Sequence, residues 1–185
     1  MNASPHFDIY RAIPGFAPRM PDLSRQTCED ETSDLSADEQ VASLQVAPET
    51  RVQYSMVTVE EAEEADGSWL ANDRENVYLW LVRTDDVKIC LENGSLGQST
   101  ERDRLSHTNL SGNVPAHCGG ELWFRDAEAI YLNGGSSRFT ARNALELEAI
   151  VKGFRAAGYK VCSFGWDEEL GRPKRTLRRA EIEWL

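Results

Sequence analysis

The sequence contains no apolar run of about 18 residues, the length that a membrane-spanning helix needs, so we expect no membrane span. Its first residues, MNASPHFDIYRAIPG, lack the basic start and the apolar stretch of a secretory signal. We therefore expect a cytoplasmic protein, or one that is exported without a cleaved signal peptide.

Basic residues are in the minority, with 20 Lys and Arg against 31 Asp and Glu and a net charge of −11. Binding to nucleic acid or to an anionic membrane requires clustered cations, so neither is expected as a partner. One local exception is the stretch GRPKRTLRR (171–179), with five basic residues in nine. It is either a solvated turn or a contact for an acidic partner or a phosphate.

The four cysteines include no CxxC pair and no zinc-finger spacing with a histidine. Cys90 and Cys162 lie in apolar, strand-like runs, where we expect them to act as small buried hydrophobic side chains. Reduced thiols are expected.

Residues 1–50 carry five of the seven prolines and little apolar periodicity, which predicts an extended N-terminal arm. The letters SADEQ resemble a helix start, so one short helix is expected near Ser36–Leu44. HFDIY (6–10) and IPGF (13–16) are too apolar for a pure linker. The arm is therefore expected to dock, either on the rest of the chain or on a partner.

Residues 51–185 read as a single α+β domain. Two hairpins are expected from β-branched and aromatic runs that are separated by turn residues. The first joins 77–84 to 87–94 through Asp85 and Asp86, and the second joins GELWFRD (120–126) to AIYLNGG (129–135). Further strands are expected at 51–59, 159–166 and 180–185, with an acidic turn or short helix at 60–67.

The clearest helix lies at 143–157. Asn143 can cap it with Glu146 in capping-box position, and apolar residues recur at spacings of three and four from Leu147 to Phe154. Gly158 provides the C-terminal stop. The expected fold is a mainly antiparallel sheet of about six strands with this one principal packed helix.

The stretch SHTNLSGNVPAHCGGELWF (106–124) concentrates chemically active residues between two predicted strands. His107, His117, Cys118 and Glu121 could bind a metal, but their spacing predicts no ligand geometry, and no metal is expected. Cys118 could instead be a nucleophile with His107 or His6 as its base. The third reading is a shaped loop whose glycines make tight turns and whose histidines bind the backbone.

A second constellation spans more of the chain. Arg102 or Arg104, the Ser136-Ser137 pair and the strand-like Glu181-Ile182-Glu183 occur in that order. This order resembles the site of arginine-type ADP-ribosyltransferases. The resemblance implies NAD as a ligand, an arginine on its phosphate, Ser136 bracing the site and the last glutamate, Glu183, stabilising a cationic ribose.

The stretch also resembles a module of plant IQ-motif calmodulin-binding proteins and of bacterial effector-like and toxin-like proteins, which reads approximately HSSFLAGGPVAAAGEL and then SGHYxP. The resemblance covers about residues 77–165. The positions that match without gaps are His107, Pro115, Gly120, Glu121 and Leu122.

The downstream half of this module is altered. Ser136 matches its first Ser, but Arg138 and Phe139 stand where the module has His and Tyr. This departure favours a binding role in which Arg138 and Phe139 contact a partner, or an altered site that uses His107, Glu121 and Arg138.

Two function hypotheses follow. The first is a protein-interaction module, such as an effector, immunity or inhibitor protein of a bacterial conflict system, whose acidic surface suits a basic protein partner. The second is a small NAD-handling or nucleotide-handling transferase, or another toxin-type enzyme. Its candidate catalytic residues are His107, Glu121, Arg104, Ser136 and Glu183.

Overall fold

The computed structural model describes residues 16–43, 74–177 and 181–185. The predicted strand at 51–59 and the acidic segment at 60–67 lie outside these ranges, as does the start of the predicted arm. Of the helices in the described ranges, none combines the length and the apolar character that crossing a membrane requires.

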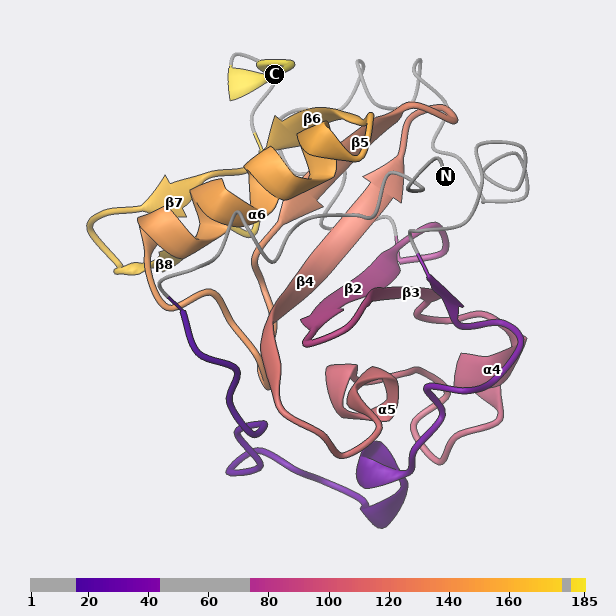
Figure 1. The fold of residues 1–185 in the computed structure, drawn as a ribbon. Coiled ribbons are helices and arrows are strands. Elements are labelled where there is room, and N and C mark those ends of the chain that lie inside the picture. Colours follow the sequence, from indigo (N-terminus) through magenta and orange to yellow (C-terminus); the bar gives the residue numbers. More distant parts are fainter. Residues whose placement is uncertain (1–15, 44–73, 178–180) are drawn as a thin grey trace, which may run out of the picture.

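A six-stranded sheet forms the centre of the fold, and its strands lie in the order β1-β3-β2-β4-β5-β6 (Figure 1). All neighbouring strands are antiparallel except β5 and β6, which are parallel. The predicted α+β fold is therefore confirmed. The strands are β1 (Ala42–Ser43), β2 (Tyr78–Arg83), β3 (Val87–Leu91), β4 (Ala116–Phe124), β5 (Ala129–Asn133) and β6 (Lys160–Ser163).

Both predicted hairpins form. At the turn between β2 and β3, the Arg83 backbone N–H donates to the Asp86 carbonyl at 2.9 Å, and its guanidinium pairs with the Asp86 carboxylate at 2.6 Å. Between β4 and β5, the Arg125 N–H donates to the Ala129 carbonyl at 2.9 Å. Both turns therefore lie where the sequence predicts them.

The predicted principal helix is α6 (Ala144–Ala156), and it supplies the crossover that the parallel pair β5 and β6 requires. The Asn143 side chain caps it by accepting a hydrogen bond from the Glu146 N–H, as the sequence predicts. Gly158 follows its end with φ +92°, a left-handed conformation that favours glycine.

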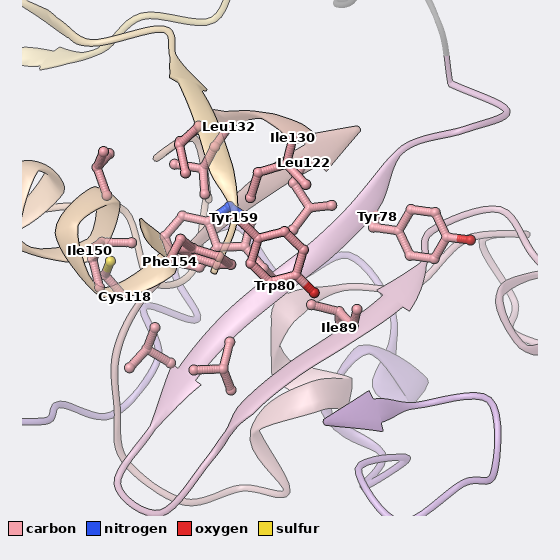
Figure 2. Close-up of a cluster of buried hydrophobic side chains, with 14 of the residues drawn as sticks. Tyr78, Trp80, Ile89, Cys118, Leu122, Ile130, Leu132, Ile150, Phe154 and Tyr159 are labelled. Carbon is pink, nitrogen blue, oxygen red and sulfur yellow. The ribbon is translucent and has the colours of Figure 1, made fainter. Parts of the chain in front are cut away.

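The main core lies between α6 and one face of the sheet (Figure 2). Ile150 and Phe154 of α6 pack with buried side chains of β2 and β4, and the Phe154 ring meets the Trp80 ring edge-on at 5.7 Å. Leu122 and Cys118 project from β4 into the same cluster. Burial of so many apolar side chains on one face fixes the strand register, because a slip of one residue would turn them away.

The opposite face of the sheet carries two separate apolar clusters. One contains Leu79 and Leu81 of β2 together with Phe139, and the other contains Trp123 of β4 and Tyr131 of β5. Because side chains that are directly opposite in a sheet share a face, the register places Glu121 and Asn133 on this face as well. These two polar side chains belong to neither apolar cluster.

Short elements surround this second face. They are the 3-10 helix η1 (Glu29–Thr32), α4 (Ser95–Gln98) and α5 (His107–Ser111). A separate two-stranded sheet of β7 (Trp166–Asp167) and β8 (Arg172–Pro173) lies beside α6 instead, and Trp166 packs against the main core (Figure 1). The described part of the predicted arm, residues 16–43, docks on the domain itself. An antiparallel bridge between Arg19 and Ala116 anchors one part of it, and β1 pairs with β3.

The helix predicted near Ser36–Leu44 is wrong for the described residues of that range, which form turns and then β1. The Asp34 carboxylate accepts from the Ser36 N–H, and the Asp38 carboxylate accepts from the Gln40 N–H, each at 2.9 Å. Such local side-chain bonds offer the backbone an alternative to helical bonds.

Three strand boundaries also differ from the prediction. The second predicted hairpin begins earlier, because β4 starts at Ala116 rather than at Gly120. The predicted strand at 159–166 is interrupted after β6, where Gly165 has φ +74°. Residues 181–185 form no strand, although Leu185 and Val161 exchange two backbone hydrogen bonds at 3.0 and 3.2 Å.

Candidate functional site

A polar cavity of about 330 Å³ lies on the sheet face opposite α6. Four of the five candidate catalytic residues, His107, Glu121, Arg104 and Ser136, line it, although they come from different elements. Glu183 does not. Its wall includes the charged and polar residues Arg74, Glu92, Arg102, Arg104, His107, Glu121, Ser136 and Arg175.

Glu121 is the central carboxylate of the cavity and is only 8% exposed. Asn133 Nδ2 donates to its Oε2 at 3.0 Å, and Arg74 Nη1 donates to its Oε1 at 2.8 Å. Burial would raise the pKa of Glu121, but these hydrogen bonds and the charges of Arg74 and Arg175 outweigh it and lower the pKa below the ordinary value. Glu121 is therefore ionised at neutral pH.

Glu92, just after β3, is the second buried carboxylate of the wall and also pairs with Arg74. In this case burial dominates, and the pKa of Glu92 is raised, although Arg74 opposes the shift. The negative charge of nearby Glu121 adds to the rise. One arginine thus joins two carboxyl groups whose pKa values are displaced in opposite directions.

The glycines before Glu121 make this arrangement possible. A Cβ on Gly119 would lie 2.6 Å from the His107 ring, and a Cβ on Gly120 would lie 2.0 Å from the Asn133 carbonyl oxygen. Gly120 lies in a strand, as predicted for 120–126, whereas Gly119 is also a strand residue and not the turn residue that the loop reading expected. The loop reading is therefore wrong for Gly119, because the His107 ring and the Trp80 carbonyl leave no space for a side chain there.

His107 opens α5, and it is 6% exposed. Its Nε2 lies 2.9 Å from the Gly120 carbonyl oxygen, which can only accept, so Nε2 carries the proton. Burial lowers the pKa of His107 to about 4. The ring is therefore neutral at pH 7, its Nδ1 is a hydrogen-bond acceptor, and none of the described residues donates to it.

Two arginines of the wall, Arg104 and Arg175, are exposed. Within the described ranges no carboxylate forms an ion pair with Arg104, and Arg175 reaches only Glu121, at 3.8 Å. The Arg175 side chain lies over Gly135, where an added Cβ would be 2.5 Å from its Nε. Both guanidinium groups are available to a ligand.

The Ser136 hydroxyl stabilises the turn that follows β5. Its Oγ accepts from the Arg138 N–H at 3.1 Å and from the Phe139 N–H at 2.9 Å. Ser137, the next residue, is exposed at the cavity.

The two candidate partner-binding residues lie inside the protein, with Arg138 4% and Phe139 0% exposed. Phe139 packs among the apolar residues beside α5. The Arg138 guanidinium pairs with Glu31 of η1 and donates to the Asp22 carbonyl at 3.3 Å. The contacts of this arginine are thus with the chain's own N-terminal segment.

The metal and Cys–His alternatives find no common site in the described residues. Cys118 is fully buried in the main core, where burial raises the pKa of its thiol, while His117 Nδ1 lies 2.8 Å from the Phe16 carbonyl oxygen. His6 lies outside the described ranges. The group in those ranges whose geometry could hold a metal is Cys28, Asp30 and Glu101, and none of these three residues lines the cavity.

The fold brings together only some of the residues that resemble the ADP-ribosyltransferase site. Arg102, Arg104 and Ser136 line the cavity. Glu183 instead lies near Cys162, whose pKa is raised to about 11, chiefly by burial. Glu181 pairs with Lys174 at 3.1 Å.

Sequence reasoning missed Arg74, Glu92, Asn133 and Glu31 as parts of this region. Arg175 belongs to the basic stretch at 171–179 that the sequence singled out, so a signal existed for it. No local sequence pattern marks the other four residues as parts of the site, because folding alone brings each of them to this region.

A comparison of the chain with family models, with curated proteins and with solved structures finds no match.

Proposed function

We propose that the protein is a small enzyme that binds a nucleotide, such as NAD or ADP, through its phosphates in the polar cavity. The observation that carries the proposal is the joining of Glu92 and Glu121 by Arg74, with their pKa values shifted in opposite directions. Titratable pairs whose environments separate their pKa values are typical of acid–base sites.

The charge of the wall supports an anionic ligand. Four arginines face two glutamates in the lining, although the whole chain carries −11. A cationic cleft on an acidic protein concentrates anions and directs them to one place. Arg104 and Arg175 supply the charges, because their guanidinium groups suit phosphate oxygens in geometry as well as in sign.

The two central side chains have different roles in this proposal. Ionised Glu121 stabilises positive charge that develops on the ligand, such as that of a ribose losing its base. His107, with a pKa of about 4, is too weak a base to take a proton efficiently at pH 7. It accepts a hydrogen bond from a ligand hydroxyl through Nδ1 and orients it.

Binding is tested by titration calorimetry with ADP and with NAD. We expect Arg104→Gln and Arg175→Gln each to weaken binding about tenfold or more, the effect of a lost charged hydrogen bond. Arg25→Gln is the matched control, since Arg25 is exposed and does not line the cavity. Absence of binding, or equal affinities for all variants, would remove the proposal.

Turnover is tested by NAD consumption. We expect Glu121→Gln to lower the rate by at least about 100-fold, while Glu183→Gln, outside the cavity lining, leaves it nearly unchanged. The reverse result would instead support the site that the ADP-ribosyltransferase-like order implies. Binding without turnover of NAD by the unmodified protein would restrict the proposal to a nucleotide-binding role.

A second candidate function is a protein-interaction module of a conflict system, with a basic protein as partner. The net charge of −11 favours such a partner. Met20 and Val114, which are 57% and 42% exposed, flank the Arg19–Ala116 bridge and offer an apolar contact. Co-purification from the host with Met20→Ser as the comparison tests it, and capture that is equal for both proteins argues against this surface.

A further inference from the structure

Glu31 of η1 is a buried carboxylate, 2% exposed, and it comes from the segment that the sequence predicts to be an arm. Its Oε1 lies 2.8 Å from Arg102 Nη1, and its Oε2 pairs with Arg138. Burial would raise the pKa of Glu31, but hydrogen bonds from Thr27 and the two arginines hold it at about 2. An internal anion thus occupies the space between two arginines.

This space adjoins the polar cavity. Arg102 and Ser106 line the cavity, and the Ser106 hydroxyl also donates to the Glu31 carbonyl oxygen at 3.0 Å. The Asn109 side chain holds the same segment through the carbonyls of Asp30 and Ser33, at 2.8 and 3.0 Å. Glu31 therefore lies directly behind two residues of the cavity wall, and its ion pair with Arg102 neutralises part of the positive charge of that wall.

The carboxylate does not satisfy both arginines fully. Arg138 Nε is a buried side-chain nitrogen that finds no hydrogen-bond partner among the described residues. The two carboxylate oxygens of Glu31 already pair with Arg102 and Arg138 and accept a hydrogen bond from Thr27. A phosphate group offers more acceptor oxygens in a tetrahedral arrangement, which suits a pair of guanidinium groups better than one carboxylate does.

We propose that Arg102 and Arg138 form a second anion site for a phosphate-bearing ligand, which Glu31 occupies until the ligand displaces it. The inference rests on the proposed function, because the ligand reaches this site through the cavity. Glu31 then acts as an internal competitor that sets how tightly the cavity binds phosphate.

The first test compares Glu31→Gln with the unmodified protein by calorimetry, with ADP and with pyrophosphate as probes. We expect Glu31→Gln to bind ADP about fivefold tighter or more, the usual lower range of a coupling between sites. Glu29→Gln, an exposed acid of the same short helix, is the matched control and should bind as the unmodified protein does. Adding Arg102→Gln to Glu31→Gln should abolish the gain.

The outcomes separate the two proposals. Equal or weaker binding by folded Glu31→Gln, with ADP bound by the unmodified protein, overturns this inference alone. Pyrophosphate binding that only Glu31→Gln achieves supports it. Failure of both proteins to bind either probe overturns this inference together with the proposed function.

The second test needs no variant and applies if Glu31→Gln fails to fold. Hydrogen exchange is measured at the backbone amides of residues 29–33 in the unmodified protein, with and without saturating ADP. Displacement of Glu31 predicts faster exchange there with ADP. Slower or unchanged exchange at full saturation overturns the inference.

Discussion

Asn133 holds Glu121 by two hydrogen bonds in opposite directions. Its Nδ2 donates to Glu121 Oε2 at 3.0 Å, and its Oδ1 accepts from the Glu121 backbone N–H at 3.1 Å. Asn133 Oδ1 also accepts from the Gly135 N–H at 2.9 Å. One buried amide therefore fixes the central carboxylate of the cavity and the turn after β5 together.

Replacing Asn133 with Ala should destabilise the protein by roughly 1–3 kcal/mol or more, because it leaves buried donors and a buried carboxylate oxygen without partners. Urea unfolding at pH 7 measures the change in the free energy of unfolding. Ser137→Ala removes an exposed hydroxyl beside the same cavity and should change it by less than about 0.5 kcal/mol. A small effect of Asn133→Ala would mean that water replaces the amide.

Gly120→Ala should destabilise the protein by about 3 kcal/mol or more, at or above the upper end for overpacking. The added Cβ would lie 2.0 Å from the Asn133 carbonyl oxygen and 2.8 Å from the Trp80 ring, so backbone has to move. The melting temperature measures this loss. Gly94→Ala is the control and should lose much less, since its Cβ would lie 3.3 Å from two Leu91 side-chain atoms, a tight contact that a shift of a few tenths of an ångström relieves.

His107 should make stability depend on pH between about 6.5 and 4. The folded protein keeps this side chain neutral down to its pKa of about 4, whereas the unfolded chain takes up the proton near its ordinary value of 6.5. The unfolded state therefore binds more protons in this window, and stability falls as the pH is lowered, by at most roughly 3 kcal/mol. Unfolding free energies at pH 7.5 and 4.5 should differ less in His107→Gln than in the unmodified protein. An unaltered difference would contradict the assignment.

Glu31 should contribute stability that is present above about pH 4.5 and is lost as the pH falls toward 2. Its pKa is about 2 in the folded state, against an ordinary value of 4.5, so the unfolded state takes up the proton first. Glu31→Gln should be less stable at pH 7 and should lose less on acidification, by a difference of up to roughly 3 kcal/mol. Urea unfolding between pH 5 and 2.5 measures both slopes. Glu29→Gln should keep the slope of the unmodified protein.

The parts of the fold that the sequence predicted are those with a local cause. The helix from 143 to 157 follows from the Asn143 cap, the apolar spacing and Gly158, all within one segment. The two hairpins follow from β-branched runs beside turn residues. The helix near Ser36 failed even locally, because Asp34 and Asp38 bind the backbone in turns instead.

The candidate site was predicted only as a set of residue types. His107 and Glu121 stood out because they occur in an unusual stretch, and the resemblance to a known module remains a prediction. Arg74 and Glu92 carried no signal, since Arg74 can join Glu92 to Glu121 only after β2, β3 and β4 have paired.

By itself, the sequence determined the helix, the hairpins and the acidic charge, because caps, periodicity and composition act within short stretches of chain. Tertiary structure alone decided that Gly119 belongs to β4 and that Gly119 and Gly120 lie too close to His107 and Asn133 for any side chain. It also decided that Glu31 meets Arg138, 107 positions away in the chain. Such contacts depend on which surfaces pack together, and no local pattern encodes that choice.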